Sequence, residues 1–127
     1  MGDRDARDLK LLLVEDFEDT RLVLRLQLEE KGFIVFEAEN GQVAVETAIR
    51  EKPDVILMDL TLPLMDGFAA TKLIRQNPEL KNVPVIAITA HQEVDFRSDA
   101  KASGFDAYVT KPIDVHWLKD LISGLLI

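Results

Sequence analysis

Charged and hydroxyl side chains stand where four short apolar runs of the sequence end. They are Glu15, Asp16, Asp59, Thr89 and Lys111. Three carboxylates brought together repel one another, and a divalent cation with oxygen ligands, such as Mg2+, is the usual remedy. A lysine ammonium and a threonine hydroxyl can both donate hydrogen bonds to phosphoryl oxygens. These residue types therefore predict a site for Mg2+ and a phosphoryl group, provided that the fold brings them together.

Each of these residues also has an ordinary structural explanation when it is taken alone. Acidic residues such as Glu15 and Asp16 are common at helix N-termini, because the helix dipole favours negative charge there. Asp59 could be a turn residue, Thr89 an ordinary strand residue and Lys111 a solvated loop charge. Four separate runs that each end in a fitting residue seldom arise by chance, so the combination favours the functional interpretation.

The elements that must position these residues can be predicted from alternating patterns. Short runs rich in β-branched residues predict strands at 9–14, 34–38, 55–58, 83–89 and 107–110. Segments of helical period predict helices at 17–31, from 41 to about 52, at about 67–76, at 91–103 and from 115 onward. With right-handed crossovers, this alternation predicts an α/β fold: a flavodoxin-like, doubly wound, five-stranded parallel sheet of order 2-1-3-4-5, flanked by five helices. Ligands of such sheets bind at the carboxyl ends of the strands.

The helices differ in how much apolar surface they offer to a core. In the first, we expect the buried face to hold Leu22, Leu24, Leu26 and Leu28. In the second, we expect it to hold Ala44, Val45, Ala48 and Ile49. The segment 91–103 is mostly polar, so it should be held least firmly and is a candidate lever beside the site.

Composition excludes several classes of protein. The chain has 127 residues, 47% of them hydrophobic, which predicts one domain at 9–127 after a charged tail at 1–8. A formal charge of -8 argues against nucleic acid as a partner, because phosphate binding needs a basic face. The absence of cysteine, of a signal sequence and of an apolar run of about 20 residues predicts a cytoplasmic protein without a membrane span.

Four motifs resemble those of the receiver domains of two-component response regulators, including the single-domain chemotaxis type. They are LLLVED at 11–16, ILMDLTLPLMDG at 56–67, VIAITA at 85–90 and YVTKP at 108–112, and the resemblance covers about 9–126. It implies a signalling switch with a phosphoryl group on Asp59, not a turnover enzyme. The donor would be a histidine kinase or a histidine phosphotransfer protein, and a downstream protein would bind a face made of the fourth helix, fifth strand and fifth helix.

The resemblance also implies a role for each matching residue. Asp16 would bind Mg2+ directly, Glu15 directly or through water, and the backbone carbonyl of Thr61 would be a further ligand. Lys111 would contact the phosphoryl group, and Thr89 would move toward it. The remaining implied positions are a rotating aromatic at Tyr108, a small residue at Ala90 and a cis peptide bond before Pro112. The side chains of Thr61 and His91 would influence the lifetime of the phosphoryl group.

The sequence departs from the receiver-domain pattern at two positions, and two rival functions stay open. Glu15 stands where Asp is commoner, and Leu62 stands where Met often precedes the proline. A phosphohydrolase of the haloacid dehalogenase kind would need a second Asp at position 61, which is Thr. A binding module that works without phosphorylation would not need the complete set of Asp16, Asp59, Thr89 and Lys111.

Residues near the predicted output face allow two interpretations. Trp117 lies off the apolar stripe of the last helix, so it is either exposed for recognition or packed at the edge of the core. Phe96 is expected to pack in the core. His91 and His116 are expected to be solvated, because no second His or Cys lies at ligand spacing. The chain stops at Ile127, which predicts either a free-standing switch or one part of a longer protein.

Overall fold

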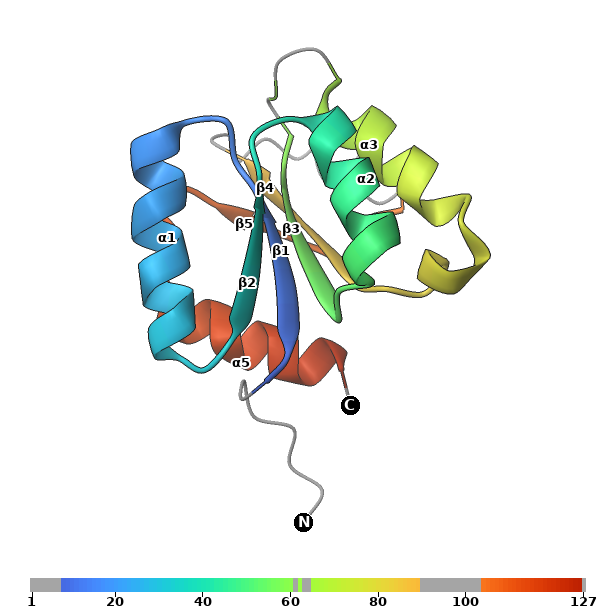
Figure 1. Cartoon of the computed structure of the whole chain (residues 1–127). Coiled ribbons are helices and arrows are strands. Elements are labelled where there is room, and N and C mark those ends of the chain that lie inside the picture. Colours follow the sequence, from blue (N-terminus) through green and yellow to red (C-terminus); the bar gives the residue numbers. More distant parts are fainter. Residues whose placement is uncertain (1–7, 61, 63–64, 90–103, 127) are drawn as a thin grey trace.

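The computed structural model describes residues 8–60, 62, 65–89 and 104–126. The strands are β1 (Lys10–Val14), β2 (Ile34–Ala38), β3 (Val55–Asp59), β4 (Val85–Thr89) and β5 (Ala107–Thr110). The helices are α1 (Glu18–Glu30), α2 (Gly41–Glu51), α3 (Gly67–Arg75), the 3-10 turn η1 (Pro78–Leu80) and α5 (Val115–Leu125). All strand pairs are parallel, in the order β2-β1-β3-β4-β5, so the predicted sheet topology is confirmed (Figure 1).

The helix count differs from the prediction. The described part of the chain holds four α-helices instead of the five predicted. The fourth predicted helix, at 91–103, lies outside the described residues, and so do most of the predicted tail and Phe96. The division of the chain into a tail and a domain at residue 9 stays a prediction.

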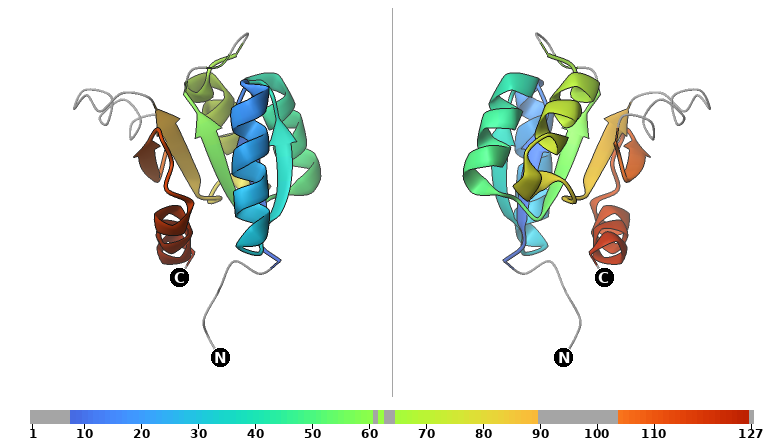
Figure 2. Two further views of the ribbon diagram at one scale, coloured as in Figure 1. Left: turned by 90° about the vertical axis from the view of Figure 1, so that its left-hand side faces the viewer. Right: turned by 90° about the vertical axis from the view of Figure 1, so that its right-hand side faces the viewer.

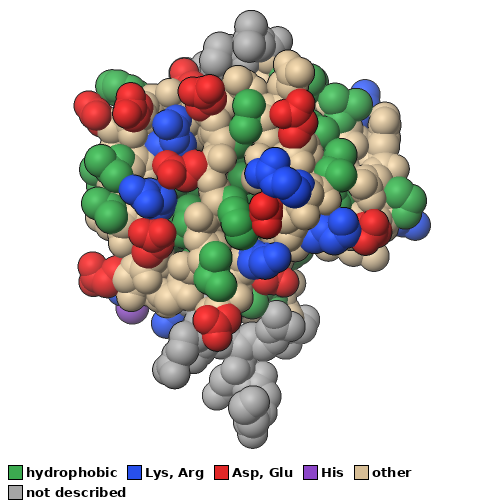
Figure 3. Space-filling model, viewed as in Figure 1, with side chains coloured by type: hydrophobic (Ala, Val, Ile, Leu, Met, Phe, Trp, Pro, Cys, Tyr) green, Lys and Arg blue, Asp and Glu red, His purple; other side chains and the backbone are tan. Residues whose placement is uncertain are grey.

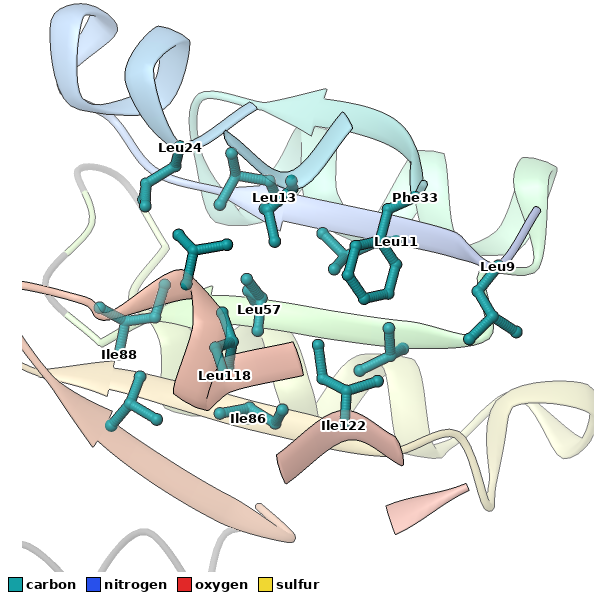
Figure 4. Packing of buried hydrophobic residues seen from close by; sticks show 14 residues of the cluster. Leu9, Leu11, Leu13, Leu24, Phe33, Leu57, Ile86, Ile88, Leu118 and Ile122 are labelled. Atoms are coloured by element: carbon teal, nitrogen blue, oxygen red, sulfur yellow. The ribbon is translucent and has the colours of Figure 1, made fainter. Parts of the chain in front are cut away.

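Helices cover both faces of the sheet. In Figure 2, α1 and α5 lie on one side of the strands, and α2 and α3 lie on the other. Residues of the strands alternate between the two layers. Leu11, Leu13 and Leu57 pack with α1 and α5, as Figure 4 shows, whereas Leu12 and Ile56 pack with α2 and α3. Burial on both faces explains why the central strands β1, β3 and β4 are almost entirely apolar instead of alternating with polar residues.

Polar side chains fix the starts of three helices. Asn40, Asp66 and Asp114 each accept a hydrogen bond from a backbone N–H in the first turn of the following helix, α2, α3 or α5. This arrangement satisfies donors that a helix N-terminus leaves unpaired. In contrast, α1 begins after Phe17, which offers no side-chain cap. The loop between β1 and α1 therefore depends on other contacts.

The predicted inner face of α1 is half wrong. Leu24 and Leu28 are buried, but Leu22 and Leu26 are 43% and 54% exposed. A helix turns by about 100° per residue, so residues two apart point in very different directions, whereas residues four apart share a face. The four leucines thus form two separate pairs, and only one pair can face the sheet.

A similar correction applies to α2. Ala44 and Ala48 are buried as predicted, and Val45 is partly buried, but Ile49 is 43% exposed. Thr47 takes the buried position instead, with 4% of its surface exposed. The inward face of α2 is lined by small side chains, and large apolar side chains lie beside it.

Candidate functional site

Three carboxylates meet at the carboxyl ends of β1 and β3. The two strands are in register from Leu11 opposite Val55 to Val14 opposite Met58, so the residues that follow come side by side. Glu15, Asp16 and Asp59 each offer a carboxylate oxygen, and these oxygens all lie within 4.8 Å of one another. Glu15 and Asp59 are buried, at 1% and 3% exposed, and Asp16 is exposed.

Lys111 lies against two of these carboxylates. Its Nζ is 3.0 Å from Glu15 Oε1 and 3.2 Å from Asp59 Oδ2. Burial alone would lower the pKa of Lys111, but the hydrogen bonds and charges of Glu15 and Asp59 outweigh it, so the pKa lies above its ordinary value of 10.5. The Lys111 backbone N–H donates to the Thr89 carbonyl at 2.9 Å, and the peptide bond to Pro112 is cis.

The donor set fits a hard divalent cation. Three carboxylates face one ammonium, which leaves two negative formal charges in a mostly buried cluster. Oxygen ligands suit Mg2+, which keeps several waters when it binds proteins, and the exposed side of Asp16 leaves room for them. Glu15 is already engaged, because its Oε2 accepts a hydrogen bond from the Phe17 N–H at 3.1 Å.

The other predicted site residues are placed less completely. Thr89 ends β4, is 3% exposed, and pairs with Thr110 of β5. Tyr108 is half-buried on β5, opposite Ala87 of β4. Thr61, Ala90 and His91 lie outside the described residues, so their predicted roles stay predictions.

Two residues that support the site were missed from the sequence. A Cβ built on Gly67, at the start of α3, would lie 2.4 Å from the Asp59 carbonyl oxygen, so α3 can approach β3 only because residue 67 is glycine. Arg21 belongs to the polar stripe of α1, yet its side chain is 16% exposed and donates to the Glu15 carbonyl. The Asp66–Gly67 pair at a helix start was a visible signal, whereas nothing local marks Arg21.

The surface near the site carries further features. Trp117 is 52% exposed, which decides between the two interpretations of this residue in favour of exposure. A surface pocket beside it is lined by Tyr108, Pro112 and Asp114, among others. On the face drawn in Figure 3, acidic and basic side chains are interspersed and no continuous basic patch is visible. Among the described helices, none is long and apolar enough to cross a membrane.

Known proteins resemble this chain over nearly its whole length. Protein PilH of Pseudomonas aeruginosa is 36% identical, over 92% of this chain and 97% of its own length. The polar-differentiation response regulator DivK of Brucella anthropi is 35% identical, over 91% and 94%. Sporulation initiation phosphotransferase F of Bacillus subtilis is 32% identical, over 92% and 93%.

Solved structures of receiver domains and of a chemotaxis protein are also similar to this chain. The receiver domain of a sensor histidine kinase from Pseudomonas aeruginosa, with a magnesium ion coordinated in its active site cleft, has a TM-score of 0.87 and 33% identity, and covers 94% of this chain and 98% of its own. A chemotaxis protein of Vibrio cholerae has a TM-score of 0.89 and 27% identity, and covers 94% and 99%. The family model for the response regulator receiver domain matches residues 11–123. With the sheet topology and the acidic cluster in agreement, this chain belongs to the response regulator receiver domain family.

Proposed function

We propose that Asp59 accepts a phosphoryl group from a phosphohistidine donor and that the chain signals through the resulting change. The observation that carries this proposal is the Lys111 ammonium between two buried carboxylates, 3.0 Å from Glu15 and 3.2 Å from Asp59. A cation held this way can move from a carboxylate to an incoming phosphoryl oxygen without leaving the cluster. The magnesium ion in the receiver domain of the Pseudomonas aeruginosa kinase supports the same use of this pocket.

The proposed reaction uses groups of this chain. A carboxylate oxygen of Asp59 attacks phosphorus, the new O–P bond forms, and the N–P bond of the donor breaks so that the donor histidine leaves. Lys111 stabilises the charge on the phosphoryl oxygens, and Thr89 is proposed to donate a hydrogen bond to another of them. Mg2+, held by Asp16, Asp59, the Thr61 carbonyl and Glu15 directly or through water, would supply the remaining charge stabilisation.

The product is an acyl phosphate that water later hydrolyses, which releases phosphate and restores Asp59. Receiver domains are thus not enzymes in the ordinary sense, and we propose that this chain is a stoichiometric phosphoryl acceptor. The donor is proposed to be a histidine kinase or a phosphotransfer protein. The same proposal places the chain in the cytoplasm, as the absence of cysteine already predicted.

The proposed output is a protein-binding face made of β5, α5 and the predicted fourth helix. Exposure of Trp117 on α5 supports this face, because exposed aromatic residues are common at protein interfaces. Tyr108 is half-buried on β5 and, as the proposed rotating aromatic, would couple the site to the same face. Nucleic acid is not a proposed partner, in agreement with the net charge of -8.

Mass spectrometry of the intact protein tests the proposal. The wild type is incubated with acetyl phosphate and Mg2+, beside Asp59→Asn and beside Asp120→Asn, which removes an exposed carboxylate on α5. We expect one phosphoryl adduct on the wild type and on Asp120→Asn, and none on Asp59→Asn or in chelator. An adduct on Asp59→Asn would move the acceptor elsewhere. No adduct on any variant, even with a histidine kinase, would favour a binding module that works without phosphorylation.

A further inference from the structure

Arg21 connects the loop between β1 and α1, residues 15–17, to the edge strand β2. Its Nη1 donates to the Glu15 carbonyl oxygen at 2.8 Å, and its Nε donates to Glu37 Oε1 at 3.2 Å. Glu37 lies on β2, opposite Leu13 of β1. The guanidinium thus links α1 to the loop after β1 and to β2, with only 16% of its side chain exposed.

This contact adds to other contacts of the loop, which include the pair between the Glu15 carboxylate and Lys111 at 3.0 Å. The loop is held on one side by the Glu15 N–H, which donates to the Ala38 carbonyl at 3.1 Å. Within the loop, the Phe17 N–H donates to the Glu15 carboxylate. No side chain caps the start of α1. The helix is instead connected to the loop through Arg21, which donates to the Glu15 carbonyl. The peptide unit that contains this carbonyl leads directly into Asp16.

We propose that Arg21 is a positioning residue for the magnesium site. By fixing the Glu15 carbonyl against β2, it holds the Glu15–Asp16 peptide in the orientation that directs the Asp16 carboxylate toward Asp59. The inference rests on the proposed function, because it concerns the Mg2+ that the acceptor site needs. Groups that orient the ligands of a metal commonly change its affinity by roughly ten- to a hundred-fold when they are removed.

Arginine suits this role better than lysine. Its planar guanidinium donates from two nitrogens at once, to the carbonyl and to the carboxylate, whereas an ammonium is a point charge on a flexible stem. The charge of Arg21 works in the opposite direction, since a cation near the pocket repels Mg2+. Loss of positioning and loss of charge therefore predict opposite changes in Mg2+ affinity, and a measurement can separate them.

Arg25 is a matched control on the same helix. Its Nε lies 3.4 Å from the second carboxylate oxygen of Glu37, so Arg25→Ala removes one positive charge and one contact to the same strand residue. Its ion pairs are with Glu37 and Glu29, both outside the acidic cluster. A general effect of charge or of helix stability would appear in both variants.

The experiment measures Mg2+ affinity from the rise of the melting temperature with Mg2+ concentration, for the wild type, Arg21→Ala, Arg21→Lys and Arg25→Ala. We expect Mg2+ to bind roughly ten-fold more weakly to Arg21→Ala, with a partial loss in Arg21→Lys and an unchanged or slightly higher affinity in Arg25→Ala. Phosphorylation of Arg21→Ala by acetyl phosphate should need more Mg2+ but reach nearly the wild-type rate at saturation.

The inference is overturned if Arg21→Ala binds Mg2+ as tightly as the wild type or more tightly, or if Arg25→Ala weakens binding equally. If Arg21→Ala does not fold, Arg21→Lys decides, and wild-type affinity in that variant overturns the inference. A wild type that binds Mg2+ but forms no adduct would count against the proposed function alone. A wild type that shows no Mg2+ dependence would overturn both.

Discussion

Charged side chains gather at both ends of the sheet, and the two groups are neutralised in different ways. At the carboxyl ends of the strands, Glu15, Asp16 and Asp59 share one ammonium, from Lys111. At the opposite end, the Arg75 guanidinium at the end of α3 pairs with one carboxylate, Asp106, at 2.8 Å. The first group has an excess of negative charge, and the second is balanced.

The Arg75 group is also saturated with hydrogen bonds. Besides Asp106, the guanidinium donates to the carbonyls of Leu80, Lys81, Val83 and Gly104. The Asp106 carboxylate in turn accepts the Val85 backbone N–H at 2.8 Å. Together these bonds tie the end of α3 to η1 and to the segments that lead into β4 and β5. A network of this kind stabilises structure, whereas an unbalanced cluster needs a ligand to complete it.

The comparison predicts the largest loss of stability at the balanced end. Arg75→Ala removes a guanidinium that serves several backbone carbonyls, so the free energy of unfolding should fall by about 3 kcal/mol. Phosphoryl acceptance by the folded fraction should not change, because Arg75 lies at the other end of the sheet. Urea denaturation and adduct mass spectrometry measure the two quantities. An Arg75→Ala variant that is as stable as the wild type but forms no adduct would contradict this division between a stabilising group and an acceptor site.

A second prediction concerns the approach of α3 to the acceptor strand. In Gly67→Ala, the added methyl group would meet the Asp59 carbonyl oxygen at 2.4 Å, which forces the backbone at the site to move. We expect a loss of about 2 kcal/mol in the free energy of unfolding, together with slower phosphorylation.

Gly124, near the end of α5, is the matched control, because a Cβ there meets nothing within 4 Å. Gly124→Ala should be neutral or stabilise the protein by up to about 1 kcal/mol, since alanine favours helix over glycine. Thermal and urea unfolding measure both substitutions. Equal changes in the free energy of unfolding would show that the close contact at Gly67 does not limit which residue can stand there.

A third, smaller prediction is a gain in stability instead of a loss. Asp59→Asn removes one negative charge from the unbalanced cluster, while Lys111 keeps Glu15 as a partner at 3.0 Å. In chelator, the free energy of unfolding should rise by about 1 kcal/mol, and the stabilisation by Mg2+ should shrink. Thermal melts with and without Mg2+ measure both changes. Unchanged melting in both conditions would mean that the carboxylates do not strain the metal-free pocket.

The smallest effect is the loss of the stabilisation by Lys111 at alkaline pH. The pKa of Lys111 is raised above 10.5 in the folded chain, so its charge stabilises the fold below that pH, and this contribution is lost as the pH rises through the folded value. Lys111→Gln should therefore be less stable than the wild type near neutral pH, and the difference should narrow at higher pH. Urea unfolding across this range measures it, with Lys72→Gln on the exposed face of α3 as the control. A constant difference would contradict the prediction.

Much of the fold followed from patterns within short stretches of sequence. Five apolar runs bounded by polar residues predicted five strands, and the observed bounds differ by at most two residues. The run from 83 illustrates the limit, since β4 begins only at Val85, where the backbone N–H finds the Asp106 carboxylate. The start of β4 thus involves a partner 21 residues away, which a local pattern does not contain.

The site was predictable for a different reason. Parallel strands place their carboxyl ends at one edge, so Glu15, Asp16, Asp59 and Lys111 could be expected to meet once the sheet was predicted. The four motifs strengthened that expectation, because each lies at a strand end. The supporting residues were not predictable, since Arg21 has the spacing of an ordinary polar stripe on α1.

By itself, the sequence determined the alternation of strands and helices, the edge of the sheet at which the acidic residues meet, and the family. These depend on residue type and spacing, which are local properties of the chain. Tertiary structure alone decided that Leu24 and Leu28, not Leu22 and Leu26, face the sheet, and that Lys111 lies between Glu15 and Asp59. Both leucine pairs satisfy the helical period equally well, and contacts between distant residues depend on how the finished layers pack. The choice among locally equivalent arrangements is made by packing.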